Sequence, residues 1–108
     1  MVDKEVPLIK AEKTLQKDVI LDKGGFFIIE VHKKEIIVEY YINVYRDKRI
    51  VSGNLEKVFS GNKADSLSDT IVRHIPHLRP EHYLYLGREL QKAQYALENN
   101  KKYVQGGC

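Results

Sequence analysis

Four residues near the C-terminal end of the chain carry groups that could do chemistry together. They are His82, Tyr85, Arg88 and Glu89, within the stretch HYLYLGRELQKA. An imidazole titrates near neutral pH, a carboxylate accepts protons, and a guanidinium keeps a fixed positive charge. Because His82 and Glu89 are seven residues apart, a helix places them on the same side, two turns from each other. We therefore expect these four residues to line a common cleft.

Two functions fit such a site. As a binding site, the four residues would contact a small anionic ligand or a metabolic partner protein, with no chemistry on the ligand. As the site of a small enzyme, His82 or Glu89 would transfer a proton on an anionic substrate that Arg88 holds. Surface pairing between neighbouring turns, such as Tyr85 with Glu89, is a third explanation and would stabilise the helix by only about 0.2–0.5 kcal/mol. The residues alone leave these alternatives open and assign no catalytic residue.

Other groupings of reactive residues match known sites poorly. One strand face contains residue types that can bind a divalent metal ion, but nothing in the sequence fixes their geometry: His32, Glu30, Glu35 and Glu39. The stretch Ser60-Gly61-Asn62-Lys63 lacks the full spacing of a phosphate-binding loop. No nucleophile elbow, dinucleotide fingerprint or zinc spacing is present. We therefore predict neither a metal ion nor a cofactor.

Length and composition indicate one small domain. The chain has 108 residues, of which 43% are hydrophobic and 31% charged, as in a globular protein with a densely charged surface. We treat residues 1–108 as a single domain with a polar lead-in at 1–16 and a flexible tail at 104–108. The abundant Lys and Glu and the single cysteine, Cys108, are typical of heat-adapted proteins.

The distribution of charge and hydropathy narrows the partners and the location. The net charge of +3 arises from 18 basic and 15 acidic residues that alternate along the chain. Because nucleic-acid binding needs basic residues clustered on one face, we do not expect a nucleic-acid partner. No apolar run approaches the roughly 20 residues needed to cross a bilayer, and the N-terminus lacks a signal-peptide core. We expect a cytoplasmic protein with no membrane contact.

The strongest strand pattern predicts a β-hairpin. The runs FFIIEVH and EIIVEYYI are separated only by Lys33 and Lys34, which implies a two-residue turn, although two lysines are unusual there. In this register Val31 pairs with Ile36, Ile29 with Val38, and Phe27 with Tyr40. The other face is too apolar for solvent, so we expect a second copy of the chain to cover it and form a homodimer. Its apolar members are Phe26, Ile28, Ile37 and Tyr41.

Further strands flank this hairpin. Residues 6–9 form a short strand or a turn, and residues 18–21 have the composition of a short strand. Residues 45–49 form a turn, and residues 49–53 and 55–59 add one or two more strands. Gly53 and Gly61 are expected to break them. Since the strands precede the helices, the fold class is α+β, an antiparallel β-meander of three to five strands followed by two helices packed on one face.

After Gly61 the apolar residues recur at helical spacing. Asn62 is a suitable N-cap for a helix that Pro76 ends, and Pro80 begins a second helix that runs to about Asn99. A helical wheel places six residues of this second helix toward the core: Tyr83, Leu86, Gly87, Leu90, Ala93 and Leu97. We attribute Gly87 to close packing of the helix backbone. The outward face contains Leu84, Arg88, Gln91 and Tyr95.

The chain also resembles a known family. The segment from His82 to Ala93, followed by Tyr103-Val-Gln, resembles the C-terminal signature of an uncharacterised domain family, summarised as HxxYLGRELxKA…YVQ. The strand motifs GFFII and IIVEYY are similar to those of the same family. That domain occurs alone and attached to archaeal proteins similar to dihydropteroate synthase. The resemblance implies an accessory role near pterin and one-carbon metabolism, and it implies that the four residues act with Gly87 as a unit.

Overall fold

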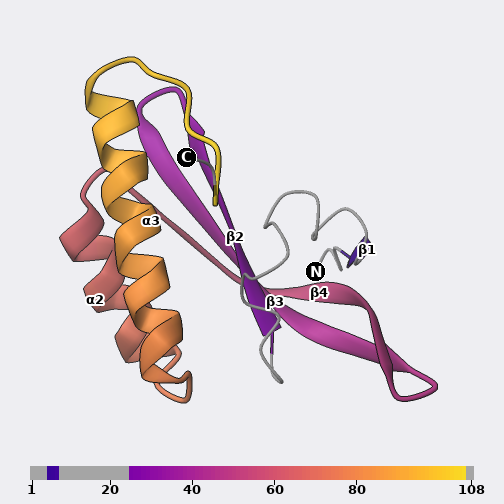
Figure 1. The fold of residues 1–108 in the computed structure, drawn as a ribbon. Coiled ribbons are helices and arrows are strands. Elements are labelled where there is room, and N and C mark those ends of the chain that lie inside the picture. Colours follow the sequence, from indigo (N-terminus) through magenta and orange to yellow (C-terminus); the bar gives the residue numbers. More distant parts are fainter. Residues whose placement is uncertain (1–4, 8–24, 107–108) are drawn as a thin grey trace.

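The computed structural model describes residues 5–7 and 25–106, and these form an α+β fold (Figure 1). An antiparallel sheet comes first in the chain and two helices follow, as the sequence predicts. The elements are β1 (Glu5–Pro7), β2 (Gly25–His32), β3 (Glu35–Arg46), β4 (Arg49–Gly61), α2 (Ala64–His74) and α3 (Pro80–Glu98). The strand expected at residues 6–9 overlaps β1, and the one expected at residues 18–21 lies outside the described residues.

The sheet has the strand order β1-β4-β3-β2, so β2, β3 and β4 form a meander. The predicted hairpin register is confirmed, because Val31 lies opposite Ile36 and Phe27 lies opposite Tyr40. In the turn between β2 and β3, Lys33 takes the left-handed conformation, with φ of 52°, which a glycine would adopt at lower cost. That conformation suits the twist of a two-residue hairpin turn.

The strands β3 and β4 form one long hairpin, and the predicted break at Gly53 is wrong. Residues 49–61 make a single strand that continues through Gly53. A side chain at this position would place its Cβ 2.5 Å from the ring of Phe26, so the glycine makes room for an aromatic ring and does not end the strand. The far end of this hairpin extends away from the helices (Figure 1).

Both helices lie on the same side of the sheet, which confirms the predicted layers (Figure 1). The core between them contains the apolar face of the hairpin and the inner faces of the helices: Phe27, Ile29, Ile36, Val38, Tyr40, Phe59, Ala64, Leu67, Ile71, Ile75, Leu78, Leu86, Leu90 and Ala93. Tyr83 and Leu97 pack against its edge. The hydroxyl of Tyr83 donates to the carbonyl of Ile75 and accepts from the amide of Leu78, which fixes the connector between the helices.

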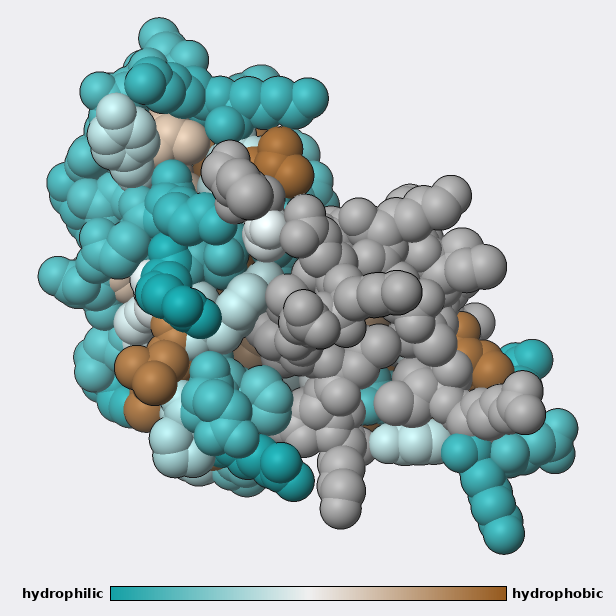
Figure 2. All heavy atoms as spheres, viewed as in Figure 1, coloured by the Kyte–Doolittle hydropathy of each residue, from teal (hydrophilic) through white to brown (hydrophobic). Residues whose placement is uncertain are grey.

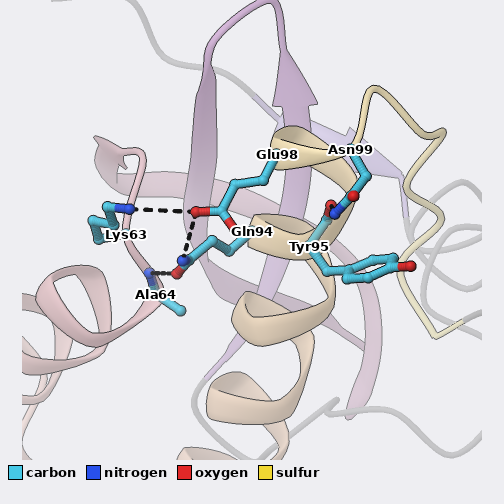
Figure 3. A network of polar contacts seen from close by, with 6 residues as sticks. All are labelled: Lys63, Ala64, Gln94, Tyr95, Glu98 and Asn99. Atoms are coloured by element: carbon cyan, nitrogen blue, oxygen red, sulfur yellow. Dashed lines mark hydrogen bonds and ion pairs between the residues drawn. The ribbon is translucent and has the colours of Figure 1, made fainter.

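The start of α2 differs from the prediction. Its N-cap is Lys63 and not Asn62, and no side chain at the cap bonds to the helix. The side-chain oxygen of Gln94, on α3, instead accepts from the backbone amide of Ala64 at 2.7 Å. Gln94 also donates to Glu98, whose carboxylate contacts Lys63 at 3.3 Å (Figure 3). A residue of the neighbouring helix therefore supplies the cap that the local sequence lacks.

The second face of the sheet is largely buried within one chain. Phe26 and Tyr41 have no exposed surface, Ile28 is 8% exposed, and Ile37 is half-buried. The rings of Phe26 and Tyr41 stack with centroids 5.2 Å apart. Most of these side chains are thus buried without a second copy, and the homodimer stays a prediction. Within the described part of the chain, no helix is long and apolar enough to cross a membrane.

Candidate functional site

The helix α3 positions all four residues that the sequence analysis selected, but they differ in environment. Glu89 is 5% exposed, Tyr85 and His82 are half-buried, and Arg88 is exposed. Pro80 at the start of α3 pre-sets the first turn, and Asn99 follows as the C-cap, so the predicted limits of this helix are confirmed.

The carboxylate of Glu89 holds the segment that follows α3. Its Oε1 accepts from the hydroxyl of Tyr103 at 2.7 Å and from the backbone amide of Gly106 at 3.1 Å. Its Oε2 pairs with the ammonium of Lys92 at 2.9 Å. Three donors therefore converge on one buried carboxylate, which is the arrangement that offsets the cost of burying a charge.

Gln105 connects the same segment to the edge of the sheet. After α3 the chain turns back and passes beside β2 (Figure 1). The side-chain oxygen of Gln105 accepts from the amide of Ile29 at 2.7 Å, and its nitrogen donates to the carbonyl of Phe27 at 3.0 Å. The nitrogen also contacts the hydroxyl of Tyr85 at 3.2 Å. Because β2 lies at one edge of the sheet, the side-chain amide of Gln105 pairs with backbone groups that a further strand would otherwise use. We call the contacts of Glu89 and Gln105 the tail clasp.

Two tyrosines in the tail clasp have raised pKa values. Burial raises the pKa of Tyr85 to about 12, and the nearby Glu89 carboxylate adds to this, while the hydrogen bond from Gln105 opposes it. Burial, together with the hydrogen bond and charge of Glu89, raises the pKa of Tyr103 well above its usual range. Both phenols therefore keep their protons to higher pH than an exposed tyrosine, and the hydroxyl of Tyr103 donates to Glu89.

The partners in the tail clasp were not selected from the sequence as site residues. Residues 104–108 were expected to form a flexible tail, whereas Gln105 is only 3% exposed, and residues 107–108 lie outside the described part. The sequence contained one signal for these residues: Tyr103-Val-Gln is part of the motif on which the family resemblance depends.

Arg88 lies in a different environment, beside a hollow on the outer side of α2 and α3. The hollow has a volume of about 520 Å³ and is lined by Asp65, Ser68, Tyr83, Leu84, Gly87, Arg88, Gln91 and Lys92. Figure 2 shows a mainly hydrophilic surface over the helices, interrupted by a hydrophobic patch beside the lower half of α3. Leu84, in the first half of that helix, is 69% exposed. Two of the four predicted residues, Tyr85 and Glu89, thus belong to the tail clasp, and Arg88 belongs to the hollow.

Gly87 forms part of this hollow, and the close packing expected around it is wrong. A Cβ built at Gly87 would meet no atom within 4 Å, apart from its own helix backbone and chain neighbours. A glycine inside a helix costs about 1 kcal/mol relative to alanine. No neighbouring atom in the structure would clash with a side chain at position 87. The glycine therefore leaves open surface between Leu84 and Arg88.

The other groupings weighed from the sequence are not assembled as sites. Among the described residues, no three His, Cys, Asp or Glu side chains come together as a metal-binding group, and His32 instead pairs with Glu30 at 3.0 Å. At the start of α2 the amide of Ala64 is already bonded to Gln94, and Lys63 contacts Glu98. These contacts occupy groups that a bound phosphate would use.

The fold and these contacts define a small α+β module with a clasped C-terminal segment. Its sequence matches the PterinBD-DUF4346 family over residues 21–106, and the chain belongs to that family. The match confirms the resemblance to an uncharacterised, pterin-associated domain family, while the particular signature around His82 stays a prediction. No solved structure matches the chain.

Two relatives show the settings in which similar sequences occur. The chain is 35% identical over 100 residues to an uncharacterized protein of Methanocaldococcus jannaschii, and this covers 93% of the chain but 17% of that relative. It is 28% identical over 113 residues to a Ycf91-like protein of Nostoc sp., covering 86% of the chain and 89% of that relative. Similar sequences therefore form one part of a long protein or most of a short one.

Proposed function

We propose that this protein is a non-catalytic binding or accessory module linked to pterin or one-carbon metabolism. Its contact site is on α3, where Arg88 is exposed, His82 and Tyr85 are half-buried, and the buried Glu89 holds the following segment against the helix. The occupant is a small anionic ligand or a metabolic partner protein, and Arg88 provides the exposed positive charge. The family to which the chain belongs supports the link to pterins.

The contacts of Glu89 carry this proposal. A general acid or base must reach the substrate, either directly or through one water molecule. The carboxylate of Glu89 is 5% exposed and already contacts Tyr103, Gly106 and Lys92. Its oxygens are therefore engaged in holding the tail, and proton transfer by Glu89 would require the tail clasp to open.

The relatives provide independent support for an accessory role. A similar sequence occupies 17% of the archaeal relative and 89% of the Nostoc relative. A module that occurs in both settings suits a protein that acts together with another domain or chain. We extend that role to this chain as part of the proposal.

The alternative, a small enzyme, gives His82 the proton-transfer role and Arg88 the role of holding an anionic substrate. Direct measurement separates the two functions. Purified protein is titrated with pterin-6-carboxylate and neutral pterin by calorimetry, and each mixture is then analysed for products by chromatography. Saturable binding without a product supports the binding module. A product whose formation depends on pH and is lost in His82→Ala would establish the enzyme instead.

An arginine on the other helix provides the matched control. Arg88→Ala is expected to weaken binding of the anionic pterin about tenfold or more, since a charge-assisted hydrogen bond contributes roughly 1.5–3 kcal/mol. Arg73→Ala removes another exposed arginine, on α2, where it pairs with Asp69, and should leave the affinity unchanged. Equal losses in both variants would indicate nonspecific attraction by surface charge and would contradict a site at Arg88.

A further inference from the structure

The hollow over Gly87 is the surface feature that the fold itself does not explain. Glycine at a packed position allows two backbones to approach closely, but a Cβ at Gly87 would meet open space. The tail clasp uses Glu89 and Tyr85, which do not line the hollow, and it reaches the hollow only through Lys92, which pairs with Glu89. Neither the core nor the clasp therefore accounts for a glycine in this part of the helix.

The size of the hollow suits a small molecule. Ligand sites in proteins usually have volumes of roughly 300–1,000 Å³, are mostly apolar and contain a few well-placed polar groups. This hollow has about 520 Å³ and is a shallow depression that is largely open to solvent. Leu84 and Tyr83 supply apolar surface at one end, and both helices contribute polar groups around it.

The arrangement of the lining residues points to the shape of the ligand. Without a side chain at Gly87, the helix surface between Leu84 and Gln91 can accept a flat ring face against the backbone. Any Cβ at this position would extend into the volume that the ring would occupy. A flat aromatic ring also suits the apolar side chains at the edge of the hollow.

The polar lining residues point to the ligand's chemical groups. Arg88 offers a planar guanidinium, which pairs best with a carboxylate or phosphate. On the α2 side, the carboxylate of Asp65 is 3.4 Å from the side-chain nitrogen of Gln91, which is a long hydrogen bond. An N–H edge of a heterocycle could replace Gln91 at Asp65 at little cost. The hollow thus offers an acceptor on α2 and a cation on α3.

We propose that the hollow over Gly87 binds a flat heteroaromatic ring that carries an anionic group. The ring lies over Gly87, its N–H edge faces Asp65, and its anionic group faces Arg88. This inference rests on the proposed function, since it names the ligand class and moves the contact from the buried Tyr85 and Glu89 to the outer side of α3.

The test uses the opposite effects of one substitution on stability and on binding. Gly87→Ala removes the helix cost of glycine and should raise the midpoint temperature of unfolding by about 4 °C or more. The same methyl group projects into the hollow at the position proposed for the ring, and it should weaken pterin-6-carboxylate binding at least fivefold, measured through the fluorescence of the pterin. A variant that is more stable yet binds less tightly cannot be explained by partial unfolding.

Two controls separate the ring contact from the charge contact. Ser66→Ala, at an exposed position of α2 outside the hollow, should raise helix stability slightly and leave the affinity unchanged. Arg88→Ala should weaken binding of pterin-6-carboxylate but not of neutral pterin, while Gly87→Ala should weaken both.

Each result has a defined meaning. Binding that is unchanged in Gly87→Ala overturns the location in the hollow and leaves the proposed binding function standing. If neither pterin-6-carboxylate nor neutral pterin binds, this inference is overturned, and so is the proposal that the occupant is a small ligand. Product formation from the bound pterin would overturn the non-catalytic function but not the location, provided that Gly87→Ala still weakens binding.

Discussion

Replacing Glu89 should destabilise the whole domain, although glutamate is usually a surface residue. Glu89→Ala leaves the hydroxyl of Tyr103 and the amide of Gly106 without their acceptor. A buried donor that loses its partner costs roughly 1–3 kcal/mol. Because Tyr103 and Gly106 are only half-buried, we expect a total loss of about 2–4 kcal/mol, a large share of the roughly 5–15 kcal/mol typical of a domain.

Urea denaturation followed by far-ultraviolet circular dichroism measures this loss through the midpoint concentration. Glu89→Gln retains an acceptor oxygen but loses the charge, so its loss should be smaller, about 1–2 kcal/mol. Glu98→Ala is the control, since Glu98 is an exposed carboxylate on the same helix that contacts Lys63 and Gln94. If Glu89→Ala and Glu98→Ala shift the midpoint equally, the tail clasp does not contribute to stability and our assignment of Glu89 is refuted.

Three further predictions concern other contacts. Gln94→Ala removes the acceptor for the amide of Ala64 and should lower the free energy of unfolding by about 1 kcal/mol in the same urea assay. An unchanged free energy would show that water caps the helix as well as Gln94 does. Lys48→Gly should raise that free energy by about 1 kcal/mol, because Lys48 has a φ of 65° in an exposed turn, and a decrease would show that its side chain contributes more than its backbone conformation costs. Stability should fall as pH rises above 10, since unfolded tyrosine ionises near 10.0 while Tyr85 in the fold ionises near 12. Urea denaturation at neutral pH and above pH 10 should show a smaller loss of stability at high pH in Tyr103→Phe than in the unchanged protein, and an equal loss would contradict the raised pKa of Tyr103.

Local patterns predicted the elements of this fold well. The alternation of apolar residues fixed the pairing of Val31 with Ile36, since a slip by one residue would place the apolar face toward solvent. Proline and asparagine marked the limits of α3 because their backbone preferences act locally. Gly53 misled the prediction, because a glycine that makes room for a ring has the same local pattern as one that ends a strand.

The candidate site was harder to predict because its contacts join distant parts of the chain. Gln105 bonds to Ile29 across 76 positions, and no periodic pattern connects them. Glu89 lies at the boundary of the core on a helical wheel. Its burial becomes favourable only because Tyr103, 14 positions later in the chain, donates a hydrogen bond to its carboxylate. The helix pattern correctly placed Arg88 outward, but it could not show that Gly87 borders open space.

The tail clasp gives a physical reason for the family domain to extend past α3 to Gly106, where the family match ends. A boundary drawn after Glu98, where α3 stops, would separate Glu89 from two of its donors and would uncover the outer strand at Phe27 and Ile29. An uncovered outer strand is a common starting point for aggregation. Excised versions of this domain from longer relatives should therefore extend at least through the residue equivalent to Gly106, and a purification tag is better attached at the opposite terminus.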